Sequence, residues 1–86
     1  MPHVPVTLLG KPGCHLCDEA RAVVERVIAE LPPGTAVLTE RNILEDAALA
    51  EKHADDIPVV LIGDRVHVYW RVDPDRFRRA LVEAAR

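Results

Sequence analysis

The sequence contains no apolar run long enough to cross a membrane, and it is poor in cysteine and in aromatic residues. Its longest apolar run, residues 57–62, is far shorter than the roughly 20 residues that a membrane helix needs. Residues 1–3 do not begin the charged and then apolar pattern of a secretory signal. We therefore expect a cytoplasmic protein with no membrane partner.

The chain also lacks internal repeats, linkers and low-complexity segments, and its 86 residues leave no room for a second domain. Hydrophobic residues make up 49% of the sequence, which makes one core feasible in a chain of this size. The net charge of -3 argues against a nucleic-acid partner. We expect a single domain over residues 1–86 that acts as a monomer.

The chain has two cysteines, Cys14 and Cys17, and only two residues separate them. In a reducing compartment a lone pair of this kind more often performs catalysis or binds a metal than cross-links a fold. A disulfide across so short a loop would also constrain the unfolded chain very little. The pair is therefore a candidate functional site.

The cysteine pair follows a predicted strand and begins a predicted helix. Residues 4–9 are apolar enough for a strand, and Gly10, Pro12 and Gly13 are turn residues. After the turn, apolar side chains recur at steps of three and four, which predicts a helix with one apolar face. These side chains are Leu16, Ala20, Val23, Val24, Val27, Ile28 and Leu31. The cysteines should therefore lie on the first turn.

This position predicts different roles for the two sulfur atoms. The first N–H groups of a helix lack partners and carry partial positive charge, which favours the reactive thiolate form of Cys14. Cys17 lies one turn later on the same face, where it could attack a mixed disulfide formed on Cys14. Lys11 and a protonated His15 would further favour the thiolate, whereas the Asp-Glu pair after Cys17 would oppose it.

The next segment predicts a second strand parallel to the first. Residues 36–41 favour a strand, and such a crossover is almost always right-handed. Asn42, with a glutamate three residues later, offers a cap for a short helix over residues 44–53. Pro5 lacks the N–H that an interior strand needs, so we expect the regular first strand to begin at Val6.

The last third of the chain predicts a hairpin and a closing helix. Residues 59–62 form a buried strand, Gly63-Asp64 is a turn into residues 65–70, and Asp73-Pro74 begins the helix. Alternation in the second hairpin strand places Val66, Val68 and Trp70 in the core and Arg65, His67 and Tyr69 on the other face. The histidines His3, His53 and His67 are expected at the surface.

The order is thus β-α-β-α-β-β-α, which predicts an α/β fold with a four-stranded mixed sheet flanked by three helices. The strand, the Cys-x-x-Cys at a helix start, Ile57-Pro58 before the hairpin and the closing helix resemble the glutaredoxins of the thioredoxin fold. The resemblance covers essentially the whole chain, and it is closest to small bacterial glutaredoxin-like proteins with Pro-Gly-Cys-His-Leu-Cys. It implies a thioredoxin-like fold in which Cys14 attacks a disulfide and Cys17 resolves the product.

The resemblance also implies where a substrate binds. The peptide bond between Ile57 and Pro58 would be cis, with Pro58 facing the cysteines and the backbone of Ile57 free to pair with an extended substrate. Lys11 and His15 complete the expected substrate contacts. The substrate would be a disulfide in a protein or a small molecule, and no tightly bound cofactor or metal is expected.

Two departures from the family pattern bear on the reductant. Asp56 precedes Ile57-Pro58 where glutathione-binding glutaredoxins usually have Thr-Val-Pro, and Tyr69 and Trp70 stand in place of a Gly-Gly pair. Bulky side chains there would block the close approach that glycines allow. Glutathione is therefore disfavoured as the reductant, and another low-molecular-weight thiol or a thioredoxin-reductase-type flavoenzyme is an open alternative.

Other functions for the cysteine pair stay open at this point. A zinc site needs two more ligands, and His53 and His67 are 14 residues apart, unlike the usual histidine spacing of zinc sites. In a carrier role, Cys14 would ligate an iron-sulfur cluster or a metal, although relatives that do so typically lack the second cysteine. In a third reading, the chain is an interaction module whose thiols are incidental. Thiol-disulfide exchange is the function that we expect.

Overall fold

The computed structural model describes residues 3–86, so residues 1–2 of the N-terminal stretch considered above lie outside it. The predicted order of strands and helices is confirmed, with one short 3-10 helix added between the second strand and the second helix. The elements are β1 (Val4–Gly10), α1 (His15–Glu30), β2 (Ala36–Asn42), η1 (Ile43–Glu45), α2 (Ala47–His53), β3 (Val59–Ile62), β4 (Arg65–Tyr69) and α3 (Pro74–Ala84).

The four strands form one mixed sheet in the order β2-β1-β3-β4. β1 pairs with β2 in parallel and with β3 in antiparallel, and β4 completes the antiparallel hairpin. Because β1 is central, it brings its C-terminal end, Gly10, beside the start of β3, where Leu9 pairs with Val59. The turn that carries the cysteines therefore begins at the same end of the sheet as Pro58.

Pro5 lies within the regular first strand, so the expectation that this strand begins at Val6 is wrong. β1 begins at Val4 and pairs with β2 from its first residue, and pairing with β3 starts only at Val6. The carbonyl of Pro5 accepts a hydrogen bond from the N–H of Gly63, at 2.8 Å, just beyond the end of β3. Since N–H and C=O of one residue point to the same side of a strand, the missing donor of Pro5 falls where no strand residue needs it.

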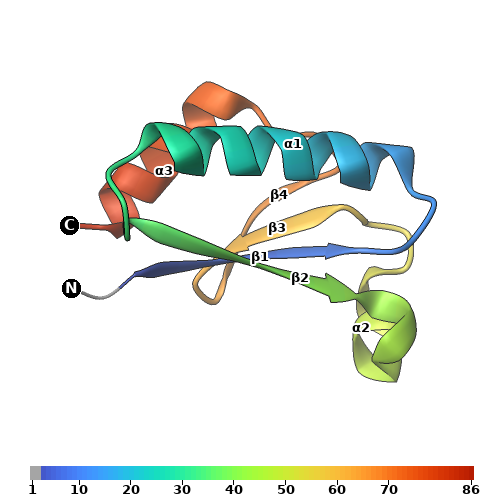
Figure 1. Ribbon diagram of the computed structural model, residues 1–86. Coiled ribbons are helices and arrows are strands. Elements are labelled where there is room, and N and C mark those ends of the chain that lie inside the picture. The colour runs from blue at the N-terminus through green and yellow to red at the C-terminus, as the bar shows by residue number, and fades with distance from the viewer. Residues whose placement is uncertain (1–2) are drawn as a thin grey trace.

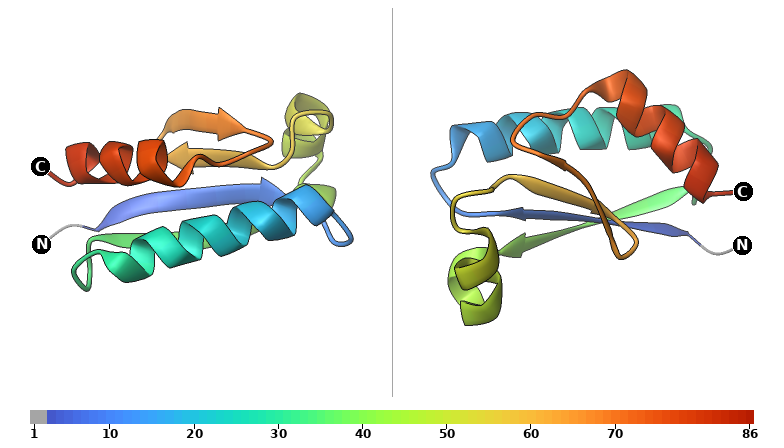
Figure 2. Two further views of the ribbon diagram at one scale, coloured as in Figure 1. Left: turned by 90° about the horizontal axis from the view of Figure 1, so that it is seen from above. Right: turned by 180° about the vertical axis from the view of Figure 1, so that it is seen from behind.

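Helices cover the two faces of the sheet unequally. α1 and α3 lie side by side over one face, whereas α2 lies beyond the C-terminal end of β2, toward the opposite face (Figures 1 and 2). Alternate residues of β1 divide between the two cores, since Val6 and Leu8 pack with α1 and α3, and Leu9 packs with Ile43 and Val59. This arrangement is the thioredoxin-like fold that the sequence predicted.

The helix predicted over residues 44–53 is divided into two helical segments. Asn42 does act as a cap, but it caps the short η1, where its side chain accepts from the N–H of Leu44. Asp46 then begins α2 by accepting from the N–H groups of Ala48 and Leu49. The second cap explains the division, because an aspartate that accepts two N–H groups favours a new helix start over a continuous helix.

The predicted burial of Trp70 and Val66 is wrong. Trp70 is 54% exposed and Val66 is 41% exposed. The register of β3 and β4 shifts between Val60 and Leu61, which leaves His67 as an extra residue in β4. At such a bulge the regular alternation of side chains is interrupted, so Val68 packs against the core while Val66 faces solvent.

His67 and His53 are less exposed than the sequence predicted, whereas His3 is exposed. The ring of His67 is half-buried with its centroid 5.6 Å from that of Phe77. His53 at the end of α2 is only 6% exposed. Its Nδ1 has no hydrogen-bond partner among residues 3–86 and lies 3.7 Å from a carboxylate oxygen of Asp56. His67 is covered by Phe77 of α3, and His53 lies on the buried side of α2.

The environment of His67 predicts a pH dependence of stability. Burial lowers the pKa of His67 below its ordinary value of 6.5, and the charge of Arg76 lowers it further. Between the two pKa values the unfolded chain binds more protons than the folded chain, so the free energy of unfolding falls as the pH drops below about 6.5. Urea unfolding at pH 7.5 and 5.5 should show a smaller decline for His67→Gln than for the parent protein. An equal decline in both proteins would assign the pH dependence to other groups.

Candidate functional site

The two cysteines lie at the start of α1, as the pattern of strand, turn and helix predicted, and they form a disulfide. Cys14 is the N-cap of the helix, and its Sγ accepts the N–H of Cys17 at 3.2 Å. The Cα atoms of the two residues lie 5.2 Å apart, within the usual range for a disulfide. A thiolate on Cys14 would keep this N–H as a donor and would also gain from the positive end of the helix dipole.

The two sulfur-bearing side chains differ in exposure. Cys17 is 1% exposed, whereas Cys14 is half-buried at the end of the helix. Gly10 contributes to this difference, since a Cβ at that position would lie 3.0 Å from Sγ of Cys17 and 3.2 Å from its Cβ. Because Gly10 has no side chain, the end of β1 packs directly against Cys17. A reagent in solution therefore reaches Cys14 more readily than Cys17.

The role of Gly10 in this contact was not predicted, because the sequence shows a glycine only as a turn residue. Gly13 does serve the turn, with a φ of +76° that favours glycine. Gly10, in contrast, ends β1 and pairs with Asn42 of β2. A glycine that ends a strand just before a functional turn is the available sign of such a close approach.

The segment before β3 lies at the same end of the sheet. The peptide bond between Ile57 and Pro58 is cis, as the resemblance implied, and Pro58 is buried. The carbonyl of Pro58 accepts the N–H of Trp70 at 2.7 Å. Within residues 3–86, no backbone hydrogen bond involves Ile57, which lies just before the first ladder residue, Val59. The backbone of Ile57 is thus available for pairing with another chain.

Lys11 and His15 flank the disulfide and are exposed. His15 is the first residue of α1, and Lys11 follows β1 directly. Among the described residues neither side chain forms an ion pair. Both are therefore accessible to a bound substrate.

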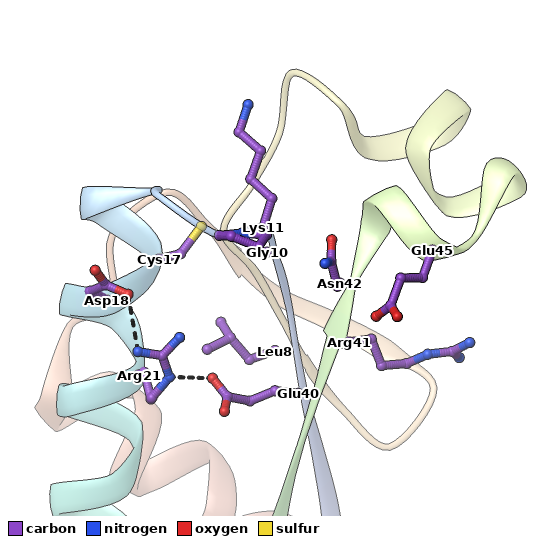
Figure 3. Close-up of a pocket in the computed structure, with 11 residues that line it drawn as sticks. Leu8, Gly10, Lys11, Cys17, Asp18, Arg21, Glu40, Arg41, Asn42 and Glu45 are labelled. Atoms are coloured by element: carbon purple, nitrogen blue, oxygen red, sulfur yellow. Dashed lines mark hydrogen bonds and ion pairs between the residues drawn. The ribbon is translucent and has the colours of Figure 1, made fainter.

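A cavity of about 280 Å³ lies between the start of α1 and the end of β2 (Figure 3). Cys17, Lys11 and Gly10 line it from the side of the disulfide. From α1, Arg21 pairs with Glu40 on β2 and with Asp18, at 3.0 Å. The hydrogen bond to Glu40 raises the pKa of Arg21 above its ordinary range, and the bond to Asp18 adds to this.

The pairing with Arg21 bears on the electrostatics of the disulfide. The sequence predicted that the carboxylate of Asp18 would oppose a thiolate on Cys14. Because the Arg21 guanidinium forms an ion pair with Asp18, it partly neutralises the charge of this carboxylate. The repulsion between Asp18 and a nearby thiolate is therefore reduced. The sequence did not identify Arg21 or Glu40 as part of this region, since the two residues are 19 positions apart and meet only through the parallel pairing of β1 and β2.

In the part of the chain that the structure describes, no three His, Cys, Asp or Glu side chains come together in a group that could hold a metal ion. His53 and His67 do not join the cysteines in such a group. A carrier role for Cys14 would thus need ligands from outside these residues. In the same range, no helix combines the length and the apolar character that crossing a bilayer requires.

Comparisons with known proteins identify the family and agree with the fold. Residues 5–82 match the model of the family described as Glutaredoxin-like domain (DUF836). Among solved structures, the X-ray structure of target protein XcR50 from X. campestris is 28% identical, with a TM-score of 0.72, and the match covers 94% of this chain and 99% of that one. Protein Ne2328 from Nitrosomonas europaea is 23% identical with a TM-score of 0.76, and the match covers 93% and 92% of the two chains. No curated protein matches the sequence.

Proposed function

The chain belongs to the glutaredoxin-like domain family, and we propose that it reduces disulfides with the Cys14–Cys17 pair. The observation that carries this proposal is the disulfide at the start of α1, with one half-buried and one fully buried sulfur. A redox pair needs one sulfur that a substrate can reach and a second sulfur close enough to displace the product. The two cysteines meet both requirements.

In the proposed reaction the thiolate of Cys14 attacks one sulfur of a substrate disulfide. The substrate's sulfur-sulfur bond breaks, its other sulfur leaves as a thiolate and takes a proton from solvent, and a mixed disulfide remains on Cys14. The thiolate of Cys17 then attacks Sγ of Cys14 and releases the second substrate thiol. Two electrons have passed from the protein dithiol to the substrate, and the protein is left as the observed disulfide.

The remaining site residues would bind the substrate rather than react. The backbone of Ile57 would pair with an extended segment beside the substrate cysteine, while buried Pro58 holds that backbone at the start of β3. Lys11 and His15 would contact the substrate around the reacting sulfur, where a positive charge favours the thiolates that form. The substrate class is a disulfide in a protein or a small molecule.

A separate reductant must restore the dithiol after each turnover. Another low-molecular-weight thiol or a thioredoxin-reductase-type flavoenzyme would serve, and glutathione is the least favoured of the three. Exposed Asp55 follows α2, and Asp56 precedes Ile57, so carboxylates stand close to the proposed binding backbone. Glutathione itself carries two carboxylates, which these residues would repel. Assays of reduction with each thiol would rank the candidates.

A redox titration tests the proposed function. The protein is equilibrated in graded thiol-disulfide buffers and quenched with an alkylating agent, and the labelled cysteines are counted by intact mass. We expect Cys14 and Cys17 to convert together as one two-electron couple, at roughly -200 to -300 mV, near the poise of a cytosolic thiol pool. A sample denatured before alkylation controls for labelling of buried Cys17. The proposal fails if both cysteines remain free across the whole range of buffers.

A further inference from the structure

The two edges of the sheet give the disulfide two different surroundings. On the β2 side, the cavity described above is lined by Lys11, Arg21 and Arg41 together with Asp18, Glu40 and Glu45, so cations and carboxylates are equal in number there. On the β4 side, a second cavity of about 450 Å³ lies between α1 and the segment that joins β4 to α3. Its lining residues are Glu19, Ala20, Ala22, Val23, Trp70, Arg71 and Val72. Since β2 and β4 are opposite edges of the sheet, a substrate meets a different chemistry on each side.

Trp70 is the main apolar feature of the β4 side. Its side chain is 54% exposed, and its backbone has a φ of +65°, a conformation that residues other than glycine rarely adopt. Two hydrogen bonds hold it there, from its backbone N–H to the carbonyl of Pro58 at 2.7 Å and from its Nε1 to the carbonyl of Asp55 at 3.4 Å. An exposed indole is thus fixed beside the segment that carries Ile57.

Carboxylates predominate around this indole. Glu19 lines the same cavity, and Asp55 and Asp56 belong to the segment on which the indole rests, whereas Arg71 is the cation that accompanies them. Within residues 3–86, neither Glu19 nor Asp55 forms an ion pair, so both carboxylates are available to a bound cation. An aromatic face next to unpaired carboxylates is a favourable site for a cation, which the ring attracts through its quadrupole.

From this arrangement we propose that the β4 side selects disulfides in peptide segments that carry a lysine or arginine beside the cysteine. The segment pairs with the backbone of Ile57, its cation lies on the indole of Trp70, and Glu19 and Asp55 are its counter-charges. This inference rests on the proposed function and adds a substrate class to it. It makes Trp70 a specificity-determining residue that takes no part in the exchange of electrons.

Single-turnover kinetics with two synthetic peptides test the inference. The peptides are identical except for lysine or glutamate after a cysteine that forms a mixed disulfide with an aryl thiol. Attack by Cys14 on the peptide sulfur releases the coloured aryl thiolate, and Cys17 then displaces the peptide thiol, so each event transfers two electrons. Each rate constant is divided by that of dithiothreitol with the same peptide, which removes the difference in intrinsic reactivity. We expect the normalised rate constant to be roughly tenfold higher for the lysine peptide.

Variants assign the preference to its residues. Trp70→Ala should bring the ratio of the two rate constants close to one, and Asp55→Asn, which leaves the backbone carbonyl in place, should lower it about threefold. Asp64→Asn is the matched control, because it removes the same charge at the hairpin turn that joins β3 to β4 and should leave the ratio unchanged. Asp55→Asn also keeps the test valid if Trp70→Ala fails to fold.

The possible outcomes separate the two proposals. Equal normalised rates for the two peptides, with the aryl thiolate released at a rate above that of a free thiol, would overturn the substrate preference and leave disulfide reduction standing. A preference that survives both Trp70→Ala and Asp55→Asn would overturn the assignment to the β4 side. Failure to reduce either peptide would overturn the proposed function, and the inference with it.

Discussion

Replacement of Cys14 with serine should abolish disulfide exchange, whereas replacement of Cys17 with serine should trap the substrate on the protein. Cys14 is the accessible sulfur at the end of α1, and a serine hydroxyl is a very poor nucleophile near neutral pH, so we expect the rate to fall at least about 10³-fold. With Cys17→Ser the first attack still occurs, but no buried thiolate is present to release the mixed disulfide. Intact mass spectrometry should then show one substrate bound to Cys14.

The two serine variants serve as controls for each other. Each loses the same disulfide, and each replaces sulfur by oxygen at a position of the first helical turn. Both variants should remain folded under reducing conditions, so a difference in chemistry reports on the roles of the two sulfurs. Trapping of substrate by Cys14→Ser instead of Cys17→Ser would reverse the proposed roles, and turnover without Cys14 would exclude the mechanism.

Replacement of Phe77 with alanine should produce the largest loss of stability. Phe77 is fully buried where α3 packs on the sheet, in the same core as Leu8, Val24 and Leu81. Truncation of a buried phenylalanine costs about 3–5 kcal/mol, because the transfer energy is lost and a cavity remains. Proteins of this size have a free energy of unfolding on the order of 5–10 kcal/mol, so the variant should retain about half of it or less.

Urea unfolding measures this loss, and Val82→Ala is the matched control. Val82 lies on the same helix but is 44% exposed, so its truncation should change the free energy of unfolding by only about 0.5 kcal/mol. Because Phe77 lies against His67, Phe77→Ala should also weaken the pH dependence predicted for His67. A cost below about 1 kcal/mol for Phe77→Ala would show that the core between α3 and the sheet is not as well packed as described.

The order of the elements and the position of the cysteines were predictable because both depend on local pattern. A stripe of apolar residues at helical spacing identified α1, and glycine and proline residues marked the turn before it. The Asp73-Pro74 pair likewise identified the start of α3, where the Asp73 carboxylate accepts the N–H groups of Asp75 and Arg76. Helix periodicity and capping residues each depend on only a few neighbouring residues, so they can be recognised from the sequence alone.

The failures share a different origin, since each depends on how distant segments meet. Strict alternation in β4 predicted that Trp70 is buried, but β4 ends at Tyr69 and Trp70 has a φ of +65°, so the alternation does not extend to it. The burial of His53 follows from the packing of α2, and the closeness of Gly10 to Cys17 follows from the approach of β1 to α1. The cis bond before Pro58 was expected only from a family resemblance, because most bonds of this type are trans.

The contact between Gly10 and Cys17 also determines which of the two cysteines a peroxide would oxidise first. Because Cys17 is 1% exposed and Gly10 covers its sulfur, an oxidant reaches Cys14 first. A sulfenic acid formed there lies next to a second thiol, which converts it to a disulfide with loss of water before a further oxygen is added. The close contact of Gly10 with Cys17 thus favours oxidation to the same reversible disulfide that the proposed reaction forms, and it protects both sulfurs from the irreversible oxidation states.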